Sequence, residues 1–444
     1  MANTYISRTQ ANGTSAKKFT ASIWFKRSPV TNVGNQPIWS SSSSTGDALD
    51  LILQGNGEIV FEDVNGNAPK FVTSRQLRDP SAFYNVVVAV DSTQATDTNR
   101  VKIYLNGVQE TSFSTATYPT QNMDFAISTS ADTMKFGSGG QYNTNYFDGL
   151  MSYVAFVDGT AYDASYFGEV DSASGIWKIN TSPSVTYGTN GCFLKMDTSS
   201  PGSDISGNNN TFTASGTPTL AEDNASNNLA TLNPLYYSTT QSTLSNGNLT
   251  ATSSGANWNN FHSTIAPSTG KWYWEIKVVN VGSNTHPIGI VGADWSDINS
   301  TSPGDSFDND TTGISYIQTG EKDVAGSRSS YGNSYTTNDI IGVAMDLTNS
   351  KLYFSKNGTF QNSGDPTSGA TGTGAISIVS GHSYLASFAH YNTMVDSINF
   401  GNGFFGVTAV ASSNADAAGH GLFEYAVPTG YYTLNTKNLN TYGG

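Results

Sequence analysis

A hairpin-like pattern occurs twice in this chain of 444 residues and constrains its fold more than any other feature. At 338–360 the sequence NDIIGVAMDLTNSKLYFSKNGTF places apolar residues at alternate positions, and VVVAVDSTQATDTNRVKIYLNGVQ at 86–109 repeats the same order of parts. Period-two alternation is typical of strands that bury one face, and an Asn-Gly dipeptide suits a tight turn. Two copies predict two domains built on similar central strands.

Short strand-like runs bounded by Gly, Asn, Asp and Ser fill the rest of the chain, and helical periodicity is nearly absent. We therefore expect an all-β protein of two tandem, jelly-roll-like β-sandwiches. Residues 198–230 are poor in large apolar side chains, and Pro234 follows them. We place the boundary there, with a first domain at 1–230 that includes a C-terminal extension and a second at 231–444 that ends in a strand segment.

Charge and composition exclude several classes of partner. Lys and Arg total 20 against 34 Asp and Glu, a net charge of −14, which repels nucleic acid. No stretch approaches the ~20 apolar residues that span a bilayer, so we expect no membrane insertion. The opening MANTYISRTQ lacks the apolar run of a signal peptide, and Cys192 is the single cysteine. This combination suits a protein assembled inside a cell and released by lysis, such as a virion protein.

Motifs in both halves resemble known families. GKWYWEI at 270–276, IGIVGAD at 288–294, GISYIQTGEK at 313–322, the hairpin at 338–360 and SINFGNG at 397–403 occur in the order of a SPRY domain. That resemblance implies a bent β-sandwich that binds partners through loops at one end and has no catalytic activity. FTASIWFKRS at 19–28, RVKIYLNGVQ at 100–109 and YFDGLMSYVAFVDG at 146–159 resemble a laminin-G or concanavalin A-like sandwich.

A third resemblance concerns origin. AYDASYFGEVDSASGIWKIN at 161–180, YGTNGCFLKM at 187–196 and SDISGNNNTFT at 203–213 are similar to the segment that follows such domains in tailed-phage structural proteins, particularly marine ones. The resemblance implies a location on the virion surface, as a tail fibre or a similar appendage. It also implies contacts with other virion proteins and, because phage fibres are commonly trimers, a homo-oligomer.

Catalysis is not expected. The concanavalin A-like scaffold includes glucanases that align carboxylates as Glu-x-Asp-x-Glu, where one acid attacks and another protonates the leaving oxygen. Here Glu58 and Glu62 have the outer spacing, but Val60 stands in place of the middle acid. We interpret the two acids as solvent-facing residues of an alternating strand, since a fold alone confers no activity.

Metal binding has one weak candidate, a calcium loop at FDNDTTG. Asp308 and Asp310 lie at alternate positions there, but Thr319 stands where an EF-hand loop requires Glu. A polar turn explains the same residues, so calcium remains an alternative and no other cofactor is expected. The histidines are scattered along the sequence at positions 262, 286, 382, 390 and 420, and we interpret them as incidental.

Loops of the second half mix aromatic rings with amides, hydroxyls and carboxylates, a combination that suits sugars and protein surfaces alike. We expect reversible, multivalent binding of a host cell-surface receptor, most simply a glycan. The alternative is a structural or decoration protein of the capsid or tail that makes protein–protein contacts. The candidate ligand-binding residues are Trp258, His262, Trp295, Asp297, Tyr331 and Tyr335.

A depolymerase assay tests the expected lack of catalysis. Incubation of host envelope polysaccharide with the purified chain is expected to release no reducing ends, because the carboxylate between Glu58 and Glu62 is missing. Release that disappears in a Glu62→Gln variant would show instead that the first domain is a hydrolase.

Overall fold

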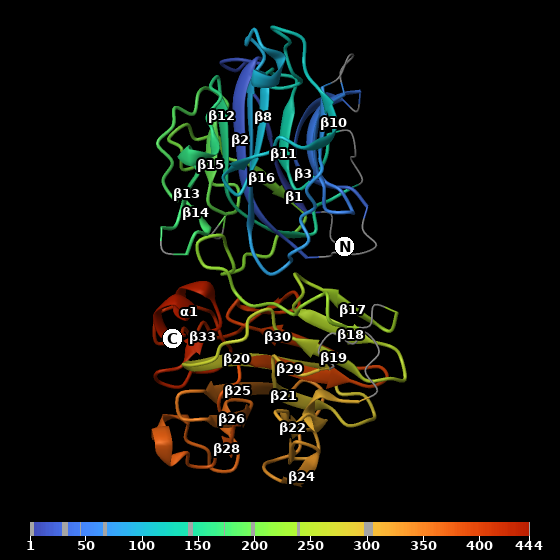
Figure 1. The fold of residues 1–444 in the computed structure, drawn as a ribbon, viewed down its shortest axis with the longest axis vertical. Coiled ribbons are helices and arrows are strands. Elements are labelled where there is room, and N and C mark those ends of the chain that lie inside the picture. The colour runs from blue at the N-terminus through green and yellow to red at the C-terminus, as the bar shows by residue number, and fades with distance from the viewer. Residues whose placement is uncertain are drawn as a thin grey trace. The chain divides into compact units, whose positions relative to one another are not determined.

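The computed structural model describes residues 4–28, 34–44, 46–64, 69–140, 145–172, 174–196, 200–237, 240–296 and 305–443. The chain divides into two compact units, one of residues 1–220 and 224–226 and the other of residues 221–223 and 227–444. This division lies a few residues before the predicted boundary at 230. The all-β prediction is confirmed, since strands dominate both units and the described residues contain one short α-helix, α1 (Thr436–Tyr442) (Figure 1). Within the same residues, no helix is long and apolar enough to cross a bilayer.

The first unit is a sandwich of two antiparallel sheets whose facing side chains form one large core. A separate two-stranded hairpin joins β13 (Gly168–Val170) to β14 (Trp177–Ile179). The eight-stranded sheet has the order β10 (Phe113–Thr117), β6 (Lys70–Thr73), β5 (Ile59–Asp63), β4 (Asp47–Leu53), β3 (Gln36–Ser44), β11 (Thr133–Phe136), β1 (Tyr5–Thr9), β16 (Thr213–Ser215). The six-stranded sheet has the order β15 (Cys192–Leu194), β12 (Gly149–Asp158), β2 (Lys18–Arg27), β7 (Tyr84–Asp91), β8 (Val101–Leu105), β9 (Val108–Gln109).

The second unit is also a sandwich, and its two sheets enclose a core of their own. The larger sheet has the order β17 (Ser242–Ser245), β18 (Thr250–Ser253), β30 (Val395–Asn399), β20 (Lys271–Asn280), β25 (Ile340–Asp346), β26 (Lys351–Lys356), β27 (Thr359–Phe360), with β28 (Ile376–Ser377) on β26 and β33 (Tyr432–Thr433) on β20. The smaller sheet has the order β19 (Asn259–His262), β29 (Tyr384–His390), β21 (Pro287–Gly292), β22 (Ile314–Ile317), β23 (Glu321–Val324), β24 (Ser327–Ser330). A short hairpin pairs β31 (Phe404–Phe405) with β32 (Thr408–Ala409).

The repeated sequence pattern forms the same three-stranded centre in each unit. Strands β2, β7 and β8 are neighbours in the first, and β20, β25 and β26 are neighbours in the second. The alternate residues that the sequence assigns to one face do face the core. They are Val86, Val88, Val90, Ile103 and Leu105 in the first unit and Ile341, Val343, Met345, Leu352 and Phe354 in the second.

Each hairpin also ends in the same Asn-Gly turn. Asn106 and Asn357 have positive φ values of 46° and 49°, a conformation that Asn tolerates better than most residues. The Asn106 side chain accepts a hydrogen bond from the backbone N–H of Asn85 at 2.8 Å, and its own N–H donates to the Asn85 carbonyl. Asn357 makes the same two bonds with Ile340. Each asparagine therefore joins the turn to the start of the first strand of its hairpin, which is β7 in the first unit and β25 in the second.

A lysine–aspartate pair joins the first two strands of each centre. Lys18 faces Asp91 across β2 and β7, with 3.3 Å between Nζ and a carboxylate oxygen. Lys271 faces Asp346 across β20 and β25 at 3.0 Å. Cross-strand pairs of opposite charge help to fix register, and a slip of one residue would turn every apolar side chain to the wrong face. The two domains therefore share a register device as well as a strand order.

Residues near the C-terminus cover the outer face of the larger sheet in the second unit. Tyr273 and Tyr353 project to that face and pack in one cluster with Phe423 and Tyr431. Glu275, fully buried on β20, accepts hydrogen bonds from the backbone N–H groups of residues 424 and 425, both at 2.9 Å. One carboxylate thus fastens the covering segment to the sheet. Burial raises the pKa of Glu275 to about 7 and outweighs these hydrogen bonds, which favour the ionised form.

The pH dependence of unfolding tests this fastening. The folded state holds a proton on Glu275 between pH 4.5 and 7 that the unfolded state has released, so stability is lost as pH rises through this window. Glu275→Gln replaces the titrating carboxyl with a neutral amide, and we expect the fall in unfolding free energy between pH 4.5 and 8, measured with urea, to shrink by about 3 kcal/mol. An unchanged pH slope in the variant would contradict the assignment.

Candidate functional site

The structure separates the predicted ligand-binding residues into buried and accessible side chains. Tyr331 and Tyr335, expected on an open loop, are 6% and 3% exposed and belong to the core of the second unit. His262 is 1% exposed. Trp295 is 9% exposed and packs against the outer face of the smaller sheet, beside Val291 and Leu385. Side chains buried to this degree contact protein, so of the described candidates only Trp258 is half-buried rather than buried. Asp297 lies outside the described residues.

The acidic candidates are engaged by protein donors. Asp308 is buried in a 3₁₀ turn, Phe307–Asn309, and accepts a hydrogen bond from the Ser315 hydroxyl at 2.8 Å. Burial raises the pKa of Asp308, which favours its protonated form and disfavours a cation. Asp310 accepts from the backbone N–H of Thr312 at 2.8 Å and so closes its own turn. In the first unit, the expectation that Glu62 faces solvent is wrong: its side chain is buried and paired with Lys70 at 2.7 Å.

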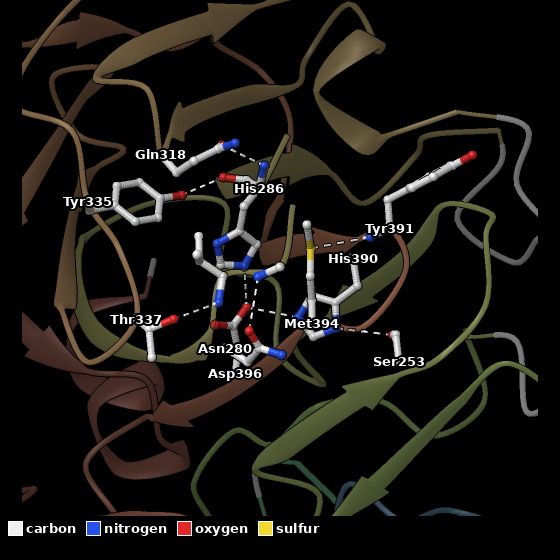
Figure 2. A network of polar contacts seen from close by, with 12 residues as sticks. Ser253, Asn280, His286, Gln318, Tyr335, Thr337, His390, Tyr391, Met394 and Asp396 are labelled. Atoms are coloured by element: carbon white, nitrogen blue, oxygen red, sulfur yellow. Dashed lines mark hydrogen bonds and ion pairs between the residues drawn. The ribbon is translucent and has the colours of Figure 1, made fainter. Parts of the chain in front are cut away.

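A buried histidine–aspartate–histidine network lies at one end of the second sandwich. His286 directly precedes β21, His390 ends β29, and Asp396 is the second residue of β30. The Nε2 atoms of both histidines approach the same oxygen, Oδ2 of Asp396, at 2.6 Å and 2.9 Å (Figure 2). All three side chains are inaccessible to solvent. Since β29 and β30 belong to different sheets, the network joins the two layers.

The protonation pattern follows from the partners. A carboxylate only accepts hydrogen bonds, so each histidine donates from Nε2–H. Nδ1 of His390 is then free to accept from the Ser253 hydroxyl at 3.1 Å, whereas Nδ1 of His286 and Oδ1 of Asp396 have no hydrogen-bond partner among the described residues. Burial alone would raise the pKa of Asp396, but the two imidazoles hold it at about 2. The carboxylate is therefore ionised at neutral pH.

These three residues are also the one group within the described ranges that could hold a metal ion. Ligand atoms about 2.0 Å from a tetrahedral zinc ion lie about 3.3 Å apart. Here the nitrogen–oxygen separations of 2.6 Å and 2.9 Å are those of N–H···O hydrogen bonds. A metal-bound histidine normally donates its second N–H to a partner, which Nδ1 of His286 does not have. The geometry therefore fits two N–H···O hydrogen bonds rather than the coordination of a metal ion.

Further hydrogen bonds link the loops that surround the network. The Tyr335 hydroxyl, from the loop between β24 and β25, donates to the carbonyl of His286. The side chain of Asn280, at the end of β20, donates to the carbonyl of Thr393 at 2.9 Å. The backbone N–H of Asn392 donates to the carbonyl of Gly255 at 2.8 Å. The loops at 254–258, 281–286, 331–339 and 391–394 are therefore joined in one assembly.

An aromatic pair lies on two of these loops. The rings of Trp258 and Tyr391 meet edge to face, with 5.4 Å between their centroids. Both side chains are half-buried, and the neighbouring Asn257 is exposed. Tyr391 directly follows His390, so one member of the pair is covalently next to the network. Half-buried rings beside the exposed amide of Asn257 form a surface that can stack on the apolar face of a ligand and hydrogen-bond at its edge.

The histidines were expected to be scattered, but two of them, His286 and His390, lie together in the folded structure and bond to the same carboxylate. His286 and Asp396 are 110 residues apart in the sequence, and only the closing of the two sheets brings them together. Sequence spacing could not reveal this, because metal and catalytic motifs are recognised over short distances. The sequence signal that existed was the placement of His286, His390 and Asp396 at strand ends near loops. Tyr391 was likewise not predicted.

His262 offers a separate test of burial in this unit. Burial lowers its pKa to about 3, and its Nδ1 lies 2.9 Å from the Ser387 hydroxyl. We expect the ring resonances of His262, measured by two-dimensional NMR on labelled protein, to show no titration between pH 7.5 and 4.5. A titration midpoint near the unperturbed value of about 6.5 would show that this side chain reaches solvent.

Comparisons with known proteins match each unit to a family. Residues 1–164 match the family described as the concanavalin A-like lectin/glucanases superfamily, and residues 271–383 match the SPRY domain. A stretch of 101 residues is 30% identical to the ATP-dependent RNA helicase DDX1 of Xenopus laevis, and it amounts to 23% of this chain and 12% of the helicase. The likeness to that protein is therefore confined to a small part of it.

Three solved structures are similar to parts of the chain. The SPRY domain of human HERC1 is 16% identical, covers 35% of this chain and 91% of its own, and has a TM-score of 0.28. A second human SPRY domain is 14% identical, with coverages of 34% and 90% and a TM-score of 0.26. Stonustoxin is 13% identical, with coverages of 38% and 27% and a TM-score of 0.30. From the two family matches, the chain contains a concanavalin A-like domain followed by a SPRY domain.

Proposed function

We propose that this chain is a non-enzymatic attachment protein on the surface of a tailed-phage particle, in a tail fibre or similar appendage, and that it binds a host-surface glycan. Concanavalin A-like and SPRY domains fit a role in binding ligands or proteins. The phage origin is supported by the resemblance of residues 161–213 to tailed-phage structural proteins. The low content of charged residues, 12%, also suits a surface that must avoid indiscriminate adhesion.

The observation that carries the proposal is the aromatic pair of Trp258 and Tyr391. A pyranose ring presents a face of C–H groups edged by hydroxyls, so it stacks on an aromatic ring and hydrogen-bonds to nearby amides. The half-buried Trp258 ring, held edge to face by Tyr391, offers such a stacking surface beside the exposed Asn257. The hydrogen bond between Asn392 and Gly255 keeps the two loops together.

Weak binding sites of this kind become effective when many copies bind at the same time. A single stacked sugar with a few hydrogen bonds binds weakly, but several copies of the chain on one particle engage neighbouring glycans at a high effective concentration. A homo-oligomer, such as a trimer, would supply these copies. Attachment is then reversible for one site and durable for the particle.

Binding to an array of bacterial envelope polysaccharides tests the proposal. We expect the full chain to bind a subset of the array, and Trp258→Ala to weaken this binding about tenfold, which corresponds to a loss of ~1.4 kcal/mol. Tyr166→Ala is the matched control, because Tyr166 is a partly exposed aromatic residue of the other domain, 39% accessible, and its loss is expected to leave binding unchanged.

Two results would contradict the proposal. Equal binding by the Trp258→Ala variant would show that the aromatic pair is not the site. Failure to bind any polysaccharide, together with stable association with other proteins of the particle, would favour the structural or decoration role.

A further inference from the structure

We propose that the His286–Asp396–His390 network is the joint that positions the proposed glycan-binding loops, and that acid opens this joint and releases the ligand. The inference rests on the proposed function for its ligand, but the opening of the loops can be measured without one. Its basis is the location of the network at the point where the two sheets of the SPRY domain meet and where four loops converge.

The network controls the loops because its three residues and the bonded Ser253 lie at the base of three of the four loops. His390 and Asp396 bracket the loop that carries Tyr391, and His286 ends the loop at 281–286. Ser253, bonded to His390, begins the loop that carries Trp258, and its backbone N–H also donates to the carbonyl of Met394 at 3.0 Å. Loss of the network would therefore free both members of the aromatic pair.

The groups that face the network are nearly all uncharged. Phe261 and Phe388 flank the ring of His390, with centroid distances of 4.9 Å and 5.2 Å. Tyr335 faces His286, and burial keeps the pKa of its hydroxyl well above 10, so it stays neutral. The Gln318 side chain accepts from the backbone N–H of His286 at 2.7 Å. In the described part of the chain, the ion pairs of Asp396 are with the two histidines.

Nearby hydroxyl and carboxyl groups complete the surroundings. The Ser253 hydroxyl that meets His390 is 2.7 Å from the hydroxyl of Ser242, so both serines are already engaged. Asp308 is a more distant carboxylate that acts electrostatically on Tyr335. The Asp396 carboxylate is thus the charged group of the network, and it accepts the hydrogen bonds of both histidines.

An added proton would place a charge on a ring that is closed to water. On His390 it would go to Nδ1, where the ring now accepts from the Ser253 hydroxyl, so that hydroxyl would have to turn and accept instead. The ring itself is fully buried, which disfavours its charged form. Opening the loops lets the His390 imidazole take up the proton in water.

The direction of the pH effect follows from linkage. Burial lowers the pKa of His390, and the hydrogen bond and charge of Asp396 restore it only in part. Below about pH 6.5, the opened state therefore binds more protons than the closed state, so acid favours opening. The Asp396 carboxyl, with its pKa of about 2, contributes only under much more acidic conditions.

Hydrogen exchange of the free chain, followed by mass spectrometry between pH 7.5 and 5.0 and corrected for the intrinsic pH dependence of exchange, tests the joint directly. We expect protection of residues 253–258 and 391–394 to fall by up to about tenfold per pH unit below 6.5, while the strands of the first domain keep theirs. His390→Gln removes the titrating ring of His390 and is expected to reduce this fall to less than about threefold.

His262→Gln is the matched control, because His262 is an equally buried histidine of the same domain that bonds Ser387 and lies outside the network. It is expected to keep the wild-type pH profile. Asp396→Asn is expected to expose the same loops at pH 7.5. If that variant does not fold, the pH profile of the His390→Gln variant decides.

Binding to a polysaccharide that the array identifies gives the functional readout. We expect affinity to fall about tenfold between pH 7.5 and 5.0 in the wild-type chain and less in His390→Gln. Acid opening without any polysaccharide binding would overturn the proposed function and leave the joint intact. Protection that does not change with pH would overturn the joint, as would a rise of several degrees in melting temperature on addition of Zn²⁺, which would reassign the three residues to a metal site.

Discussion

The pairing of three central strands is the interaction on which both domains depend. In each domain a lysine at the start of the first strand meets an aspartate at the end of the second, as Lys18 does with Asp91 and Lys271 with Asp346. The asparagine of the Asn-Gly turn that follows the third strand then hydrogen-bonds to the start of the second strand. Together these contacts fix the register that directs alternate apolar side chains into the core. Each centre lies within one of the two sheets of its domain, and the other sheet packs against it across the core.

Much of this centre was predictable from the sequence. Val86, Val88 and Val90, and likewise Ile341, Val343 and Met345, alternate with period two, and the residues assigned to the core are in it. The positive φ of Asn106 and Asn357 follows from the chemistry of the Asn-Gly dipeptide. Short-range patterns were informative because strand alternation and tight turns are determined over a few residues.

The candidate site was less predictable, for physical reasons. Tyr331 and Tyr335 stand among polar residues, which gave no sign that the chain turns their rings into the core. His286 and Asp396 meet only because two sheets close on each other, and no local pattern records that contact. Trp258 was predicted as a binding residue and is half-buried, but its partner Tyr391 was not predicted. Side-chain burial and long-range convergence are properties of the packed fold.

Buried carboxylates act repeatedly as fasteners of irregular backbone. In the first domain, Asp158 accepts from the N–H groups of Thr14 and Asn190. In the second, Glu275 holds the covering segment, and Asp416 accepts from the N–H groups of His420 and Thr433. Asp396 differs because one of its donors is the imidazole of His390, a side chain that can take up a proton, whereas peptide groups do not. The same device that elsewhere gives static support becomes sensitive to pH beside the proposed binding loops.

Trp258 is the proposed surface that meets a sugar. The most direct test labels the chain at its seven tryptophans and follows their indole N–H resonances by NMR while an envelope polysaccharide that binds the chain is titrated in. We expect the Trp258 resonance to shift in proportion to saturation while those of the buried Trp272 and Trp274 do not move. A shift confined to Trp24, Trp39 or Trp177 would place recognition in the concanavalin A-like domain and contradict the proposal.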